Sequence, residues 1–298
     1  FGLAKRPSKL PAFDIVHAHS PGMIGLLGLY YARREDVPSV YTHHTPIEEY
    51  FDQSIDSQTI ANVLKKLYVP TETSVLRRFD TVTVSTDRMD RTVESVKLPV
   101  GVDTEFFRPR ELSAAENQTL VGYSGRISME KNVGEILAVA ERLSACEFMI
   151  VGEGPRRPAL EARAPDNVTF RDFLPREQLP GFYSALDAFV TASTADTLGL
   201  STLEANACGT PVAAADVSPF TETIGADNGA RFEYGDTTGM ARAIDRCLSE
   251  EWDTRNAVRE FSVGRTVRNL ETIYRELQSE PAPTNKHIRA KIKQNPRL

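Results

Sequence analysis

The sequence has few cysteines, no long hydrophobic run and no excess of positive charge. Its three cysteines, Cys146, Cys208 and Cys247, are too few and too widely spaced for a disulfide framework. No stretch reaches the roughly 18 consecutive apolar residues that a membrane span needs. A net charge of −6 argues against a general nucleic-acid-binding protein. These absences predict a globular protein of the reducing cytoplasm.

Several common catalytic and nucleotide-binding motifs are also missing. No P-loop pattern occurs, and Arg157 stands where the third glycine of a dinucleotide fingerprint beginning at Gly152 belongs. Arg126 likewise replaces the last glycine of a nucleophile elbow at residues 122–126. No Asp-x-Asp metal motif is present either. We therefore expect no P-loop NTPase, no dehydrogenase, no resident metal and no cofactor.

Short apolar runs alternate with amphipathic segments along most of the chain, which predicts parallel sheets covered by helices. In the first third, the expected strands are 13–17, 39–43, 81–85 and 97–100, and the expected helices are 20–34 and 56–78, the second broken or kinked at Pro70. In the second series, the expected strands are 120–123, 147–151, 167–170, 188–192, 211–215 and 230–232, and the expected helices are 132–143, 158–164, 178–185, 203–208, 240–248 and 257–277. Two such series predict two doubly wound α/β domains, residues 1–110 and 111–277.

The last residues, 278–298, form a basic tail that carries lysines and arginines but no acid after Glu280. Its composition is typical of a solvated, disordered end. A contact with an anionic surface is the alternative.

Four of the five histidines lie close together in sequence pairs: His17 with His19, and His43 with His44. A metal site is one hypothesis, although no nearby acidic cluster completes a ligand shell. The alternative for His17 is a polar residue in a half-buried strand. The pair His43 and His44 closes a strand, and strands of parallel sheets end at the ligand crevice. We therefore expect this pair to face substrate.

A loop after the first strand of the second series has the composition of a diphosphate site. It contains Gly125, Arg126 and Lys131 and leads into a helix, whose free amides and dipole favour an anion. Gly125 allows close backbone approach, and the two cations supply charge-assisted hydrogen bonds. The alternative is a solvated charged loop.

A second stretch places two carboxylates, Asp196 and Glu204, on either side of Gly199. If Gly199 opens a helix, the amides of Gly199 and Leu200 are free to bind phosphate oxygens. A carboxylate accepts two hydrogen bonds at once, which suits sugar or ribose hydroxyls. The alternative is an Asp that complements the helix dipole and a surface Glu.

Together these residues resemble the retaining family-4 glycosyltransferases of GT-B architecture. The matching segments are 14–22, 42–46, 98–103, Gly125-Arg126 with Glu130-Lys131-Asn132, 151–155, 173–175 and 196–212. The likeness extends to about residue 277. It implies two Rossmann-like domains facing a cleft, an N-terminal acceptor-side domain and a C-terminal nucleotide-sugar-binding domain.

The resemblance also implies a hexose transfer from a UDP- or GDP-linked donor, with a role for each matching residue. Arg126 and Lys131 correspond to the pair that holds the diphosphate, Glu204 to the residue on the ribose, and Asp196 to the residue on the transferred sugar. Phe173 and Leu174 lie where the family seats the base. The donor set further includes Gly125, Leu198, Gly199 and Leu200, and His44 matches the histidine beside the donor sugar. With no metal motif, Arg126, Lys131 and helix-end amides must neutralise the departing diphosphate.

The block 197–200 and the upstream segment 44–50 look most like those of glycolipid-forming members. This similarity implies a lipid acceptor such as diacylglycerol or phosphatidylinositol, or else a carbohydrate. The expected acceptor-side residues are His19, His43, Thr45 and Tyr50. A lipid acceptor implies peripheral contact with the inner face of the membrane.

Two departures from the family pattern keep alternatives open. Asp196 replaces the first Glu of the family motif and is one methylene shorter. The chain begins with Phe1, just before the strand near Asp14, so the N-terminal domain is expected to be incomplete. The alternatives are a truncated, non-catalytic glycosyltransferase-like protein and a metal-dependent hydrolase that uses the histidine cluster.

Overall fold

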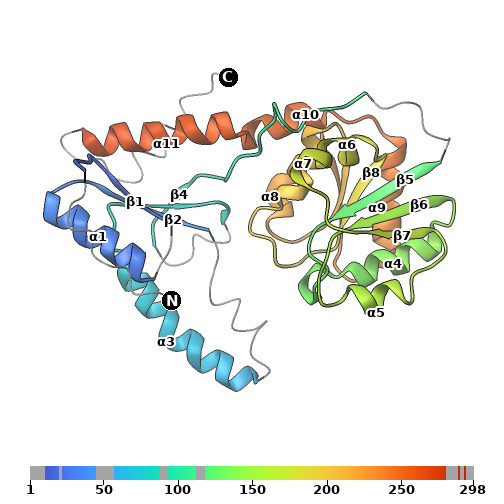
Figure 1. Ribbon diagram of the computed structural model, residues 1–298, viewed down its shortest axis with the longest axis horizontal. Helices are drawn as coiled ribbons and strands as arrows, with labels where there is room; N and C mark the ends of the chain where they lie inside the picture. The colour runs from blue at the N-terminus through green and yellow to red at the C-terminus, as the bar shows by residue number, and fades with distance from the viewer. Residues whose placement is uncertain are drawn as a thin grey trace. The chain divides into compact units, whose positions relative to one another are not determined.

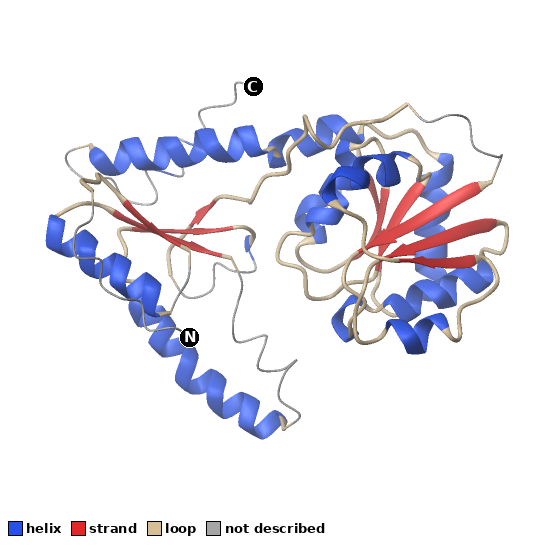
Figure 2. Cartoon of the chain, viewed as in Figure 1, coloured by secondary structure: helices blue, strands red, loops and turns tan. Residues whose placement is uncertain are grey.

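The computed structural model describes residues 11–19, 22–44, 57–87, 93–111 and 118–279, together with 288 and 292. The chain divides into two compact units, residues 1–99 with 266–298, and residues 100–265 (Figure 1). In each unit the strands form one parallel sheet with helices packed against it (Figure 2). The predicted fold class, α/β with two parallel-sheet domains, is confirmed.

The first unit is a four-stranded sheet whose order follows the chain, β1-β2-β3-β4. Its strands are β1 (Val16–Ala18), β2 (Ser39–His43), β3 (Thr81–Val84) and β4 (Val96–Lys97), and its helices are α1 (Met23–Glu35), α3 (Gln58–Leu76) and most of α11 (Val263–Gln278). All neighbouring strands pair in parallel.

The second helix was expected to be broken or kinked at Pro70, and the break is wrong, because α3 runs through this proline as one element. Both halves of the helix are anchored in the unit, since Ala61 and Leu76 are both buried. The Thr71 hydroxyl also donates to the Leu67 carbonyl in the turn that contains the proline, at 2.8 Å. This packing outweighs the roughly 3 kcal/mol that a proline costs a helix interior.

Helices cover both faces of the first sheet. Tyr41 packs with residues of α1 and α3, including Leu29 and Leu76. The adjacent Val40 points to the other face and packs with Ile273 and Leu277 of α11. Ile288, which belongs to the predicted tail, is buried in this same cluster.

The helix expected at 257–277 is divided, and its larger part belongs to the first unit. It consists of α10 (Thr254–Ala257), a short 3₁₀ turn η4 (Val258–Phe261) and α11. The division has a physical cause at Ser262, which is extended and forms a parallel bridge with Val102. The chain from Thr266 onward therefore lies with the N-terminal strands rather than with residues 111–265.

The second unit is a six-stranded parallel sheet of order β10-β9-β8-β5-β6-β7. Its strands are β5 (Thr119–Ser124), β6 (Cys146–Val151), β7 (Val168–Arg171), β8 (Ala188–Thr191), β9 (Val212–Ala215) and β10 (Gly229–Phe232). Besides α10 and η4, its helices are α4 (Val133–Arg142), α5 (Arg157–Glu161), α6 (Leu179–Ser184), α7 (Leu200–Ala207), α8 (Phe220–Thr223) and α9 (Thr237–Ser249). It also has the 3₁₀ turns η2 (Met129–Lys131) and η3 (Arg176–Gln178). Numbered within the unit, this is the doubly wound order 3-2-1-4-5-6.

Two hydrophobic clusters fill the two faces of this sheet. Val190 packs on one face with residues of α4 and α9, such as Ile136 and Ile244. Its neighbour Phe189 packs on the other face with Tyr183 of α6 and Leu203 of α7. The order in which strands are added to the sheet reverses between β5 and β8, so the carboxyl ends of these two strands form the topological switch point, where open α/β sheets bind their ligands.

None of the helices in the described part of the chain reaches the length and hydrophobicity that a bilayer-spanning segment requires.

Candidate functional site

The two stretches that the sequence singled out meet at the switch point of the second unit. The loop after β5 carries Arg126 and Lys131, and the loop after β8 carries Asp196. Two hydrogen bonds join the loops: the Thr194 backbone amide donates to the Glu130 carbonyl at 3.1 Å, and the Asn132 side-chain amide donates to the Ala192 carbonyl at 3.0 Å. The parallel pairing of β5 with β8 thus brings both stretches to one edge of the sheet.

Lys131 and Asp196 form the central contact of this site. The Lys131 Nζ atom lies 2.8 Å from Asp196 Oδ1, and the two side chains are only 19% and 23% exposed. The sequence assigned these residues to two different parts of a donor, and the structure brings them into direct contact. The lysine therefore has a partner of opposite charge that an anionic ligand could replace.

Tyr123 holds the backbone of the loop after β5 through a hydrogen bond. The Tyr123 hydroxyl donates to the Arg126 carbonyl at 2.9 Å. Burial, and then the negative charges of Asp196 and Glu130, raise the pKa of this phenol, so it remains a donor at neutral pH. The Arg126 side chain is exposed to solvent. The loop is thus fixed at its backbone while its cation can reach outward.

The glycine-rich stretch at residues 151–155 packs against the backbone of this loop. Gly152 has φ +145°, and a Cβ atom there would lie 1.9 Å from the Gly125 carbonyl oxygen. The Gly125 amide donates to the Val151 carbonyl at 3.0 Å, and the Ile127 amide donates to the Glu153 carbonyl at 2.8 Å. Gly152 thus serves the contact between two loops. The residue pattern alone gave no signal for that role.

Gly199 is the N-cap of helix α7, which starts at Leu200, three residues before the expected start at 203. It has φ +73°, in the left-handed region that favours glycine, and a Cβ there would lie 2.6 Å from the Phe220 ring. Asp196 precedes the helix and Glu204 lies within it. Leu200 is exposed, whereas Leu198 is buried in the core, so only the backbone of Leu198 can serve a ligand.

Glu204 is held by Tyr183, a residue that the sequence analysis missed. The Tyr183 hydroxyl donates to Glu204 Oε2 at 2.9 Å. Burial raises the pKa of Glu204, and the Tyr183 hydrogen bond and the charge of Arg176 partly oppose this effect. Phe173 and Leu174, the residues expected to contact the base, differ in exposure. The Phe173 side chain is 71% exposed, and Leu174 is partly buried against the core.

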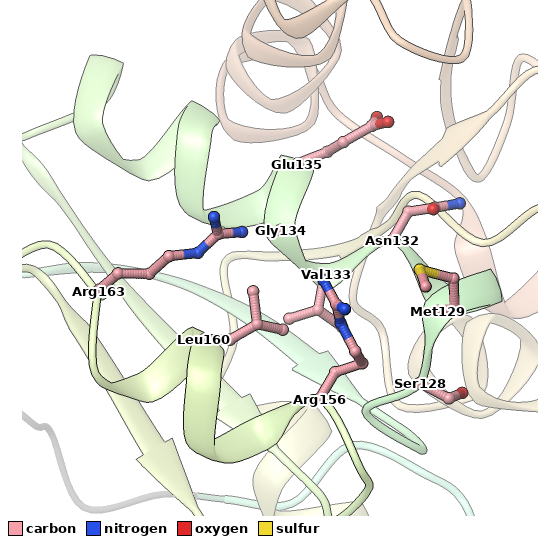
Figure 3. Close-up of a pocket in the computed structure, with 9 residues that line it drawn as sticks. All are labelled: Ser128, Met129, Asn132, Val133, Gly134, Glu135, Arg156, Leu160 and Arg163. Atoms are coloured by element: carbon pink, nitrogen blue, oxygen red, sulfur yellow. The ribbon is translucent and has the colours of Figure 1, made fainter.

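A small hollow lies beside the loop after β5, within the second unit (Figure 3). It has a volume of about 180 Å³ and is bordered by Ser128, Met129, Asn132, Val133, Gly134, Glu135, Arg156, Leu160 and Arg163. In Figure 3 the guanidinium groups of Arg156 and Arg163 both point toward the first turn of α4. The sequence analysis singled out neither arginine.

Three of the four clustered histidines lie together in the first unit. The rings of His17 and His19 stack with centroids 4.2 Å apart, and those of His19 and His44 with centroids 5.1 Å apart. His19 Nδ1 lies 2.8 Å from His44 Nε2. Burial, followed by the charge of His19, lowers the pKa of His44.

His43 points away from this group. It is buried, and its Nε2 atom lies 3.7 Å from Glu72 of α3. Thr45 and Tyr50, the other predicted acceptor-side residues, lie outside the described residues. Within the described part of the chain, no three His, Cys, Asp or Glu side chains are grouped so that they could hold a metal ion.

Two protein families match the chain. Glycosyl transferases group 1 matches residues 105–262, more than half of the chain, and Glycosyltransferase Family 4 matches residues 3–106. These ranges follow the two halves that carry the candidate residues.

Three relatives illustrate the similarity among curated proteins. A 2-deoxystreptamine N-acetyl-D-glucosaminyltransferase from Streptomyces fradiae is 30% identical over 82% of this chain. An alpha-monoglucosyldiacylglycerol synthase from Acholeplasma laidlawii is 28% identical over 67% of it, and a GDP-mannose-dependent alpha-(1-6)-phosphatidylinositol dimannoside mannosyltransferase from Mycobacterium tuberculosis is 28% identical over 76%. The matches span 65%, 58% and 61% of these relatives' own lengths, so each relative is considerably longer than its match.

Solved structures share the fold at low identity. A sucrose-phosphate synthase from Thermosynechococcus elongatus matches with a TM-score of 0.74 and 22% identity, covering 89% of this chain and 74% of that one. Anabaena HepE in complex with UDP and glucose matches with a TM-score of 0.61 and 16% identity, covering 95% and 77%.

Proposed function

We propose that this chain, which belongs to the glycosyl transferases group 1 family, transfers a hexose from a UDP- or GDP-linked sugar to a hydroxyl acceptor. The observation that carries the proposal is the contact between Lys131 and Asp196 at the switch point of the second sheet. A cation next to a carboxylate at this edge suits a ligand with a charged diphosphate beside a sugar rich in hydroxyls.

In this proposal the donor is held by the residues of the second unit. Arg126 and Lys131 bind the diphosphate, aided by the amides of Gly199 and Leu200 at the start of α7. Glu204 accepts hydrogen bonds from the ribose, and Asp196 from the transferred sugar. Phe173 and Leu174 contact the base, which agrees with the exposure of the Phe173 ring.

The reaction proposed is a transfer with retention of the anomeric configuration. The bond between the anomeric carbon and the diphosphate oxygen breaks, and the acceptor oxygen forms the new bond on the same face of the sugar. The departing diphosphate takes the acceptor proton, and Arg126 and Lys131 stabilise its charge. His44 contacts the sugar during this step. Analysis of the product anomer by NMR tests retention.

The acceptor proposed is a lipid hydroxyl, such as that of diacylglycerol or a phosphatidylinositol. Relatives named for monoglucosyldiacylglycerol and phosphatidylinositol dimannoside support this choice. Relatives named for 2-deoxystreptamine support a water-soluble acceptor instead. The acceptor assay therefore needs both classes.

The decisive experiment combines donor binding with transfer. Thermal unfolding is measured with a panel of UDP- and GDP-sugars, and the best donor is then supplied with vesicles containing each lipid or with 2-deoxystreptamine. We expect stabilisation by one nucleotide class and transfer to a lipid. Donor binding without any transfer would instead favour a non-catalytic protein, and zinc-dependent hydrolysis would favour the hydrolase.

We also propose that the protein is cytoplasmic and contacts the membrane peripherally. One face of α3 exposes Ile60, Val63, Leu64 and Leu67, at the spacing of successive helix turns, and Lys66 is exposed on the same helix. An exposed apolar stripe on a helix that also exposes a cation suits an anionic lipid surface. The basic tail lies mostly outside the described residues.

Flotation with anionic vesicles tests this contact. We expect binding at low salt, weaker binding at high salt, and loss of binding in the double variant Ile60→Ser with Leu67→Ser. Deleting residues 281–298 measures the contribution of the tail separately. A protein that remains unbound in every condition and glycosylates a water-soluble acceptor contradicts both the membrane contact and the lipid acceptor.

Substituting Asp196 with glutamate tests the sugar assignment. If Asp196 is a shorter version of the family's glutamate, Asp196→Glu preserves or raises turnover. Asp196 Oδ1 lies 2.8 Å from Lys131 Nζ, and the longer glutamate side chain can still reach this lysine. Asp196→Asn, which removes the charge, should lower turnover by about tenfold or more. Loss of turnover in Asp196→Glu as well would show that the pocket requires the shorter side chain.

Glu204 should give donor binding a pH dependence. Because burial raises its pKa, Glu204 takes up a proton at a higher pH than an ordinary glutamate does and then accepts ribose hydrogen bonds less well. Affinity for the nucleoside diphosphate should therefore fall from pH 7 toward pH 5. Glu204→Gln should bind about tenfold more weakly at pH 7 and lack this component.

Calorimetry measures the binding of the same ligand to the wild type and to Glu204→Gln across this pH range. Comparing the two proteins cancels the effect of the ligand's own titration. Tyr183→Phe is the matched variant, because it removes a hydrogen bond that lowers the pKa of Glu204. Its affinity should begin to fall at a higher pH than that of the wild type. Equal pH profiles in all three proteins would remove Glu204 from the ribose site.

A further inference from the structure

The C-terminal helix α11 reaches into the histidine group of the first unit through Tyr274. The Tyr274 hydroxyl lies 2.6 Å from His17 Nδ1, although the two residues are 257 positions apart. The other ring nitrogen of His17 lies 2.6 Å from the Thr42 hydroxyl, which lies 2.7 Å from the hydroxyl of Thr83. A continuous chain of hydrogen bonds thus runs from α11 across β1, β2 and β3.

This chain of hydrogen bonds fixes the orientation of the His17 ring. Burial, and then the charges of His19 and His44, lower the pKa of His17 to about 4, so its ring is neutral at physiological pH. A neutral imidazole has one donor and one acceptor. Of the two neighbours of the ring, Tyr274 at Nδ1 and Thr42 at Nε2, one donates to the imidazole and the other accepts from it. Both ring nitrogens of His17 are therefore engaged.

His17 in turn supports the two histidines beside it. The His19 ring stacks on His17 with an interplanar angle of 29°, and its Nδ1 atom is bonded to His44 Nε2. His44 stacks on His19 with an angle of 16°. With Nε2 of His44 engaged by His19, Nδ1 is the ring nitrogen that can meet a ligand.

We infer that Tyr274 is a positioning residue for His44 and acts through His17 and His19. This inference rests on the proposed function, in which His44 contacts the transferred sugar during the reaction. Tyr274 touches no proposed ligand site itself. Its role is to hold the stack of three rings in the arrangement that presents one nitrogen of His44.

Tyr274→Phe removes the hydroxyl and keeps the aromatic ring, and Tyr31→Phe is the matched control on α1. We expect Tyr274→Phe to lower kcat by about 3- to 10-fold with the donor KM unchanged, and Tyr31→Phe to change neither. His17→Asn should lower kcat to a similar extent. The double variant should be no worse than the poorer single variant, because both substitutions break the same chain. Additive losses, an unchanged kcat or a raised donor KM would overturn the inference.

A second measurement is independent of transferase activity. The ¹⁵N imidazole signals of His19 and His44 should shift in Tyr274→Phe and stay in place in Tyr31→Phe. If Tyr274→Phe does not fold, Thr42→Val interrupts the chain at the other nitrogen of His17 and is measured instead. Shifted signals without any transfer would contradict only the proposed function. Unshifted signals would overturn the role of Tyr274.

Discussion

Replacing Lys131 with alanine is expected to lower kcat/KM for the nucleotide-sugar donor by about 10- to 100-fold, since one charge-assisted contact at the leaving group is lost. The same change leaves Asp196 without its partner at 2.8 Å, in a site where both side chains are mostly buried. Repulsion between the unpaired carboxylate and the donor diphosphate adds to the loss. Steady-state kinetics with varied donor concentration measure the effect.

Arg246→Ala is the matched control, because it also removes a cation from an ion pair of the second unit. Arg246 pairs with Glu250 one helix turn away on the exposed surface of α9, and such pairs contribute little. The double variant Lys131→Ala with Asp196→Asn removes the unpaired carboxylate and should partly restore donor affinity. If Lys131→Ala resembles Arg246→Ala, the diphosphate does not bind at this lysine.

The second large effect is expected from Gly152→Ala. A methyl group there would lie 1.9 Å from the Gly125 carbonyl oxygen, a backbone atom that cannot move without moving the loop that carries Arg126. The positive φ of Gly152 adds strain for any other residue. We expect a free energy of unfolding lower by about 2–4 kcal/mol and a loss of donor binding even below the unfolding transition.

Gly181→Ala provides the comparison for this variant. Gly181 lies inside α6, and nothing lies within 4 Å of a Cβ atom added there. Alanine should stabilise that helix by up to about 1 kcal/mol and leave donor affinity unchanged. Chemical denaturation and calorimetry of both variants separate the two effects. Wild-type donor affinity in Gly152→Ala would mean that the support from residues 151–155 does not matter for binding.

Much of the secondary structure could be predicted from local sequence patterns. The strand at 39–43 has the predicted bounds, because its residues are strong strand formers, whereas the helix after Gly199 starts three residues before the expected position 203. The break at Pro70 was predicted from one residue, and packing at both ends of α3 overrides it. Local propensity is thus reliable until tertiary contacts oppose it.

The contacts of the site depend on topology instead. Lys131 and Asp196 are 65 positions apart, and only the pairing of β5 with β8 makes them neighbours. Tyr183, which binds Glu204, and Tyr274, which binds His17, could not be predicted for the same reason. A tyrosine in an amphipathic helix is typical of any core. A resemblance can name the residues of such a site, but it does not give their hydrogen-bond partners.

The return of α11 to the first sheet has a consequence for the order of folding during synthesis. The ribosome makes the first four strands early, yet Ile273 and Leu277, which cover Val40 and Leu98, emerge only after the whole second unit. Residues 100–265 are contiguous and bring their own core, so they can fold as soon as they leave the exit tunnel. The first sheet meanwhile keeps one apolar face bare. A nascent chain halted before residue 266 therefore presents a finished C-terminal unit beside an N-terminal one that chaperones would still recognise.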